Sequence, residues 1–170
     1  NLCGALEFAE NISKVGTQPI IGTQINFKFE DTTGLLPLIA LNEIGYKRII
    51  ELSSKSYLEN DALSEPHLDI KELLTNTEGV ILLSGSIQGL FGKLFEKGRL
   101  DEINKIYKSL LSKFNDRFYL EIQRHGDQNE NAFEKYNLEQ SLKIKLPIIA
   151  TNEVYYLTPD MHEAHDALTC

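Results

Sequence analysis

The sequence predicts an α/β protein in which a sheet or barrel of strands is covered by helices. Short runs of β-branched and aliphatic residues alternate with longer segments whose apolar residues recur at helical spacing, which is typical of strand–helix–strand units. The 170 residues are 42% hydrophobic and 25% charged, enough for one domain with its own core. We therefore predict a single domain with a parallel sheet or barrel and helices outside it.

Each expected element has a local cause. Residues 18–29 contain Pro-Ile-Ile-Gly-Thr-Gln-Ile-Asn-Phe, whose β-branched and aromatic side chains favour a strand. Asn42 and Asp69 precede helical patterns and can cap them through their side-chain oxygens. Further strands are predicted at residues 35–41, 78–85, 117–123 and 146–151. Helices are predicted at residues 2–15, 43–58, 70–74, 101–114, 131–142 and 159–168, with another after residue 85 that ends near residue 96.

Charge and composition exclude several classes of function. The chain has 17 basic and 25 acidic residues, a net charge of −8, which argues against a large nucleic-acid-binding surface. No apolar run approaches the length of a membrane helix, and the first residues lack a signal-peptide pattern. Cys3 and Cys170 lie at opposite ends, which fits neither a disulfide framework nor a paired metal motif. We expect a reducing, cytoplasmic location and no membrane partner.

The predicted strand at residues 117–123 carries the most informative polar pattern. Side chains alternate along a strand, so Glu121, Gln123 and His125 share one face while Phe118 and Ile122 lie on the other. In a barrel the apolar face meets the helices and the polar face points inward. Two interpretations stay open: a ligand or acid–base site, or a hydrogen-bonded interior network. In a network, loss of His125 would cost about 1–3 kcal/mol.

Other polar motifs are weaker. His162 and His165 are three residues apart, not in the His-Glu-x-x-His arrangement of zinc enzymes, and a solvated helix face is expected. Gly85, Gly89 and Gly92 follow a strand, but their spacing matches no phosphate-binding loop, so they predict a turn.

Six blocks of sequence occur in the order and spacing of a known family. They are residues 1–8, 19–22, 42–46, 78–85, 116–126 and 149–157. The chain closely resembles the polymerase-and-histidinol-phosphatase (PHP) domain of bacterial replicative DNA polymerase III alpha subunits. The resemblance implies a PHP-type distorted seven-stranded β/α barrel. Residues 1–170 would be one segment of it, truncated at both ends and lacking the first strands, with the polymerase domains downstream.

The resemblance also implies a metal site whose ligand positions can be compared one by one. Active family members bind up to three zinc or manganese ions and hydrolyse phosphoesters, which gives a 3′–5′ exonuclease in the polymerase. The family ligand positions correspond here to Gln24, Leu35, Ser86, His125, Glu153 and Tyr155. Zinc needs thiolate, neutral imidazole or carboxylate donors, which most of these positions lack. We therefore expect no catalytic residue and no metal in this segment.

Three hypotheses about function remain. The first is a non-catalytic PHP scaffold in DNA replication that docks a proofreading exonuclease subunit; the second is an active metal-dependent exonuclease or phosphoesterase. The third, which ignores the resemblance, is an unrelated β/α-barrel enzyme acting on a small metabolite. Nucleotidyl transfer by the DNA-directed DNA polymerase would use Mg²⁺ in a downstream palm. Contacts with other holoenzyme subunits, the sliding clamp and DNA would involve the full chain.

A docking surface is expected to centre on aromatic or arginine anchors. Four residues are candidates for such anchors: Tyr57, Phe91, Phe95 and Arg99.

Overall fold

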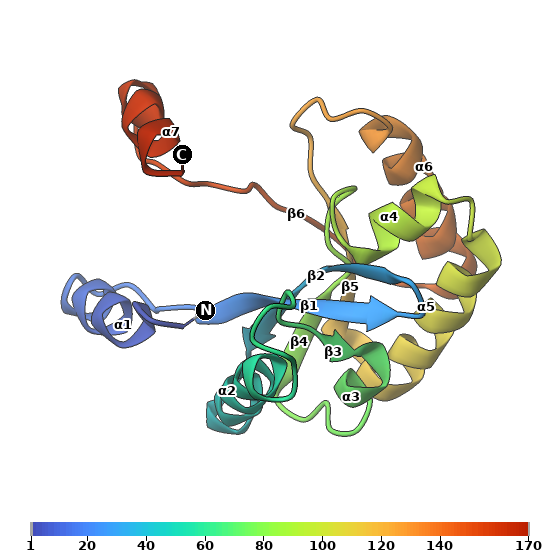
Figure 1. Ribbon diagram of the computed structural model, residues 1–170, viewed down its shortest axis with the longest axis horizontal. Helices are drawn as coiled ribbons and strands as arrows, with labels where there is room; N and C mark the ends of the chain where they lie inside the picture. The colour runs from blue at the N-terminus through green and yellow to red at the C-terminus, as the bar shows by residue number, and fades with distance from the viewer. Residues whose placement is uncertain (1, 170) are drawn as a thin grey trace.

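The computed structural model describes residues 2–169, and one mixed β-sheet lies at its centre (Figure 1). The strands are β1 (Gly22–Phe29), β2 (Thr32–Ala40), β3 (Leu68–Asp69), β4 (Val80–Leu83), β5 (Phe118–Ile122) and β6 (Ile148–Ala150). Their order across the sheet is β3-β1-β2-β4-β5-β6. The sheet is therefore open, with β3 and β6 at its edges, and the predicted α/β class is confirmed.

Seven α-helices accompany the sheet in the described residues. They are α1 (Ala5–Lys14), α2 (Glu43–Leu58), α3 (Ile70–Leu73), α4 (Leu90–Glu96), α5 (Leu100–Phe114), α6 (Glu130–Ile144) and α7 (His162–Thr169). Helix α2 packs on β1, β2 and β4, α4 packs on β2, and α5 and α6 pack on β5. In contrast, α1 and α7 contain no buried residue and extend away from the sheet on the left of Figure 1. In residues 2–169, no helix is long and apolar enough to cross a membrane.

The expectation of an all-parallel sheet is wrong for β1 and β2. These strands form an antiparallel hairpin in which Phe29 pairs with Thr32, and β2 also runs antiparallel to β4. The connection is only Glu30 and Asp31, and so short a turn can join only antiparallel neighbours. Glu30 takes a positive φ of 53° to make it. The pairs β1–β3, β4–β5 and β5–β6 are parallel, as strand–helix–strand units require.

The core lies between the sheet and the helices packed on it. Its largest fully buried side chains include Phe27, Phe91, Tyr107 and Phe118. The ring of Tyr107 on α5 lies 4.8 Å from Phe91 and 5.6 Å from Phe118, in edge-to-face geometry. Phe118 therefore marks the helix-facing side of β5, and the residues that alternate with it face the other side.

Both predicted helix caps are present. The Asn42 side chain accepts a hydrogen bond from the Gly45 amide at 3.0 Å, and that of Asp69 accepts one from the Lys71 amide at 2.8 Å. Gly45 also lets α2 approach the turn before β4, because a Cβ at this position would fall 1.8 Å from the carbonyl oxygen of Gly79. The start of α2 is thus fixed by its cap and by backbone packing.

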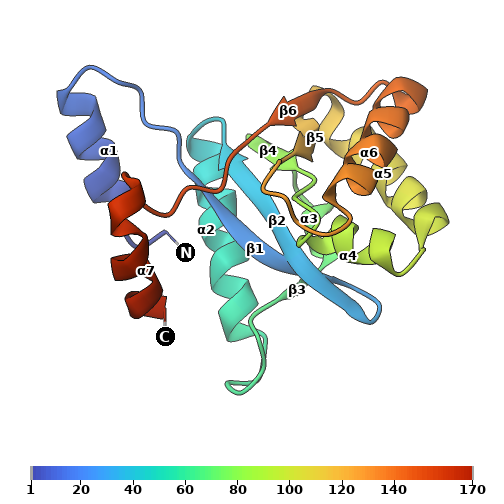
Figure 2. The same cartoon turned by 90° about the horizontal axis from the view of Figure 1, so that it is seen from above.

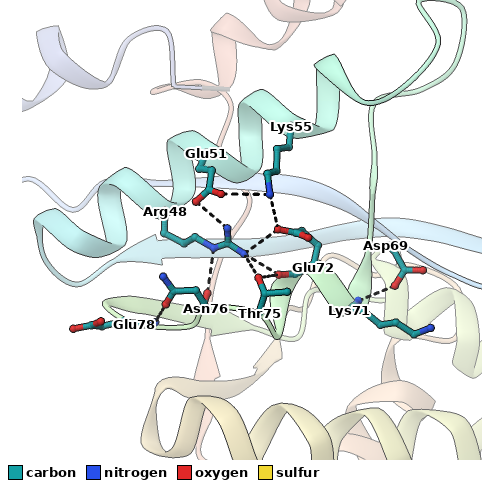
Figure 3. Close-up of polar contacts among 9 residues, drawn as sticks. All are labelled: Arg48, Glu51, Lys55, Asp69, Lys71, Glu72, Thr75, Asn76 and Glu78. Atoms are coloured by element: carbon teal, nitrogen blue, oxygen red, sulfur yellow. Dashed lines mark hydrogen bonds and ion pairs between the residues drawn. The ribbon is translucent and has the colours of Figure 1, made fainter.

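A buried arginine joins α2 to α3 and to the segment that follows α3 (Figure 3). Arg48 is 5% exposed, and its Nη2 donates to the Glu72 carbonyl and to Thr75 Oγ1, both at 2.8 Å. Its Nε donates to the Asn76 carbonyl at 3.2 Å, and its Nη1 pairs with Glu51 at 2.9 Å. Every guanidinium nitrogen therefore has a partner, and we call this set of contacts the Arg48 network.

Candidate functional site

A small cavity of about 50 Å³ lies where β4, β5 and β6 end, beside Gln24 of β1 and Leu35 and Pro37 of β2. It is lined by Gln24, Leu35, Pro37, Gly85, Ser86, Gln88, Gly89, Glu121, Gln123 and Glu153. Four of the six family ligand positions therefore meet here: Gln24, Leu35, Ser86 and Glu153. We call this cavity the strand-end pocket.

Glu121 is the most buried polar group of the strand-end pocket. It is 4% exposed, and its Oε1 accepts hydrogen bonds from Gln123 Nε2 at 3.2 Å and from Thr151 Oγ1. Gln123 Nε2 also donates to Thr151 Oγ1 at 3.1 Å, while the Glu121 amide donates to Ser84 Oγ at 2.9 Å. The structure thus brings Glu121 and Gln123 together through β5 and β6.

Sequence reasoning missed Ser84 and Thr151 as members of this network. The β5–β6 register pairs Ile122 with Ala150, so Thr151 follows directly beside Gln123. Ser84 follows β4, and its amide donates to the Tyr119 carbonyl at 2.9 Å. In the sequence, Ser84 and Thr151 are each visible as a hydroxyl residue at the end of an apolar strand. Their hydrogen-bond partners on β5 could be identified only once the strand order was known.

The electrostatics of Glu121 reflect its burial. Burial raises the pKa of its carboxyl group, and the nearby charge of Glu153 raises it further. Hydrogen bonds from Thr151 and Gln123 oppose this shift because they favour the charged form, and the nearby Gly85 backbone lowers the pKa as well. Burial dominates, so the proton is held more tightly than on an exposed glutamate.

His125 does not join Glu121 and Gln123. Strand β5 ends at Ile122, so the alternation that placed His125 on the same face no longer holds, and its side chain is exposed. Its backbone amide donates to Glu130 Oε1 at 2.8 Å, and the Gly126 amide donates to Glu130 Oε2 at 2.9 Å. These two bonds lower the pKa of Glu130. The segment around His125 is therefore held by hydrogen bonds from the His125 and Gly126 amides to the Glu130 carboxylate, and the His125 side chain takes no part in them.

Tyr155 also lies outside the strand-end pocket. It is exposed, its hydroxyl donates to the Glu153 carboxylate, and its ring centroid lies 5.2 Å from that of His165. The ring of Tyr156 lies 5.8 Å from His162 and 5.7 Å from His165. Both histidines of α7 thus contact tyrosines in the extended segment before the helix, which goes beyond the solvated helix face that was expected.

The side chains of the strand-end pocket do not fit a multinuclear zinc or manganese centre. Gln24 supplies a neutral amide, Ser86 a hydroxyl and Leu35 no donor, while His125 and Tyr155 lie elsewhere. Within residues 2–169 no three His, Cys, Asp or Glu side chains are grouped so that they could hold a metal ion. Zinc sites are built from such groups, and hydroxyl and amide oxygens replace them poorly. We derive no metal-dependent step from this arrangement.

Comparison with known proteins places these features in a family. The family model of the PHP domain matches residues 1–125. The chain belongs to the PHP domain family. This PHP domain is 36% identical to the DNA polymerase III subunit alpha of Rickettsia bellii, over 100% of the chain and 15% of the relative. It is 37% identical to that of Caulobacter vibrioides (100% and 16%) and 34% identical to that of Vibrio cholerae (98% and 15%). It thus spans about 15% of the length of these relatives.

The four expected anchor residues lie in different environments. In this PHP domain Tyr57 is 62% exposed on α2, whereas Phe91 is fully buried in the core and cannot be a surface anchor. Phe95 packs on Phe133, with ring centroids 5.4 Å apart. Arg99 is paired with Glu30, Asp31 and Glu102. Of the four, Tyr57 is the anchor candidate that the fold leaves open to a partner.

Proposed function

We propose that this PHP domain is a non-catalytic scaffold of a replicative DNA polymerase, acting in DNA replication in the cytoplasm. The observation that supports it most directly is a contrast within the domain. The strand-end pocket holds an amide, an aliphatic and a hydroxyl side chain at family ligand positions, while a continuous core of buried residues surrounds β1, β2, β4 and β5. A scaffold needs a well-packed core but no metal ligands, and this domain combines the two features.

The proposed partner is the proofreading exonuclease subunit, with the polymerase's own domains as intramolecular neighbours. A stable dock of this kind buries about 1,200–2,000 Å² in total and depends on a few central anchors. The outer surface of α2 offers Ile50 and Tyr57, seven residues apart and both exposed, so they lie on one helix face. We assign the exonuclease dock to this face.

The first test measures binding of the exonuclease subunit to the full-length polymerase and to a form without the PHP domain. Binding should be lost with the domain; binding that survives the deletion contradicts the proposal. Tyr57→Ala in the full-length chain should weaken binding by about 30-fold, the effect of removing a strong anchor. Leu142→Ala is the matched control, because Leu142 is an exposed apolar residue of another helix, α6.

A second test addresses the absence of catalysis. The full-length polymerase, purified without chelator, is analysed for zinc and manganese and assayed for 3′–5′ exonuclease activity without the exonuclease subunit. Two or more tightly bound ions per chain, or nuclease activity that is lost in His125→Ala, would support the metal-dependent exonuclease instead.

A further inference from the structure

We propose that the strand-end pocket binds a primary ammonium group, held by Glu121 Oε2 and Gln123 Oε1. These two side-chain oxygens are buried and have no hydrogen-bond partner among residues 2–169. Both residues line the same cavity. The proposal is independent of the scaffold function proposed above.

These two oxygens need a hydrogen-bond donor. Buried acceptors are almost always satisfied in folded proteins, and leaving one unpaired is unfavourable. Thr151 and Gln123 direct their donors to the other oxygen of Glu121, Oε1. The Gly85 backbone favours the charged carboxylate but makes no hydrogen bond to Oε2. Oε2 can therefore accept a donor from another group, and a donor that also reaches Gln123 Oε1 would satisfy both oxygens.

The charge of the strand-end pocket favours a cationic donor. Glu121 and Glu153 both line the strand-end pocket, whereas no lysine, arginine or histidine does. A cationic donor would compensate these carboxylates in a place where water screens charge poorly. The Arg48 network shows the same principle in this domain, with the buried charge of Arg48 next to Glu51 and Glu72.

The unpaired atoms and the volume of the strand-end pocket fit an ammonium group. An ammonium group has three donors and no acceptor, so it matches a lining whose unpaired atoms are acceptors. It is compact enough for a cavity of about 50 Å³, and a water molecule occupies about 30 Å³ in the liquid. Calcium prefers six to eight oxygen ligands, and zinc prefers nitrogen and sulfur. The ammonium group would be a lysine Nζ from elsewhere in the full-length protein or a free small amine.

The experiment uses the full-length protein and hydrogen exchange read by mass spectrometry, at fixed pH and ionic strength. Methylammonium chloride is compared with tetramethylammonium chloride, whose cation has no N–H donor, and with potassium chloride. If the ligand is a free amine, methylammonium should slow exchange in residues 118–123 and 148–151 by about tenfold, and the other two salts should not. Glu121→Gln should abolish this protection, whereas Glu139→Gln, on the exposed side of α6, should keep it. Unchanged exchange in α2 shows that each variant is folded.

A second arm detects a lysine that already occupies the pocket. A water-soluble carbodiimide activates the Glu121 carboxylate, the lysine Nζ forms an amide bond with it, and the carbodiimide leaves as its urea. A Glu121–lysine cross-link then identifies the lysine. The proposal is overturned if neither the cross-link nor protection by methylammonium is found. It is equally overturned if potassium or tetramethylammonium protects as well as methylammonium, or if protection persists in Glu121→Gln.

Discussion

The Arg48 network and the strand-end pocket both bury a charged side chain, but only one of them satisfies it. Arg48 and Glu121 are 5% and 4% exposed. Each nitrogen of Arg48 has a partner on α2 or in the segment around α3 (Figure 3), whereas Glu121 Oε2 and the neighbouring Gln123 Oε1 have none among residues 2–169. Figure 2 shows α2 and β5, the elements that carry Arg48 and Glu121, on either side of β1 and β2 in that view. A saturated network is built for stability. A buried network with open acceptors can accept a hydrogen bond from another group, as we propose for the strand-end pocket.

We expect the largest change in the free energy of unfolding when the Arg48 network is disrupted. Arg48→Ala removes hydrogen bonds to Glu72, Thr75 and Asn76 and the ion pair with Glu51. It should lower the free energy of unfolding by about 2–4 kcal/mol, because backbone carbonyls that a charged donor satisfied are left unpaired. Urea titration with hydrogen exchange read in residues 43–58 measures it.

Arg48→Lys serves as the matched control for Arg48→Ala. A lysine keeps the charge but cannot reproduce the planar fork of donors, so it should recover only part of the loss. Full recovery by lysine would show that charge alone matters and that the geometry of the network does not.

Glu121→Gln should not destabilise the domain as Arg48→Ala does. Glu121→Gln keeps the size of the side chain and removes a buried charge that lacks a full set of partners. We expect the free energy of unfolding to change by less than about 1 kcal/mol, with stabilisation the expected sign. The same urea titration, read in residues 118–123, measures it. A loss as large as that of Arg48→Ala would place Glu121 among the structural groups and remove the contrast between the two regions.

The stability of His125→Ala distinguishes the prediction made from the sequence pattern from the one made from the structure. The strand pattern alone predicts a cost of about 1–3 kcal/mol for its loss from an interior network. The structure places its side chain in solvent and holds the segment through backbone bonds to Glu130. His125→Ala should therefore cost less than about 0.5 kcal/mol, whereas Glu130→Ala should loosen residues 123–130 in hydrogen exchange. The reverse ranking would show that His125 belongs to the network.

Local signals in the sequence predicted well, and long-range ones did not. The caps at Asn42 and Asp69 and the apolar face of Phe118 follow from neighbouring residues, so they could be read directly. The β1–β2 hairpin was missed because the alternation of strand and helix patterns was interpreted as a parallel sheet throughout, although the gap at residues 30–34 is short enough for a hairpin loop.

Contacts between distant residues show the limit more sharply. The Arg48 network joins the Arg48 side chain to backbone carbonyls 24 and 28 positions away, and no spacing rule indicates such a pairing. Phe91 was proposed as a surface anchor because aromatic character was visible and burial was not. Four family ligand positions meet in one pocket, but the position of His125 depended on where β5 ends.

The last expected effect is the pH dependence of the Arg48 network. Hydrogen bonding and charge from Lys55, and then from Arg48, lower the pKa of Glu72 below its ordinary value of 4.5. A carboxylate with a lowered pKa in the folded state contributes stability that is complete above its ordinary pKa. That stability is lost as the pH falls through the lowered pKa. Because Glu72 and Lys55 are partly exposed, we expect this contribution to stay below about 1 kcal/mol.

Glu72→Gln isolates that contribution. The variant should be less stable than the parent at pH 7, and the difference should shrink as the pH falls below about 4.5. Urea midpoints for residues 43–58 at pH 7 and pH 4 give the two differences, and Glu139→Gln on the exposed side of α6 is the control. A difference that stays constant between these pH values would mean that Glu72 acts through packing and its backbone carbonyl. The charge in the network would then rest on Arg48 and Glu51 alone.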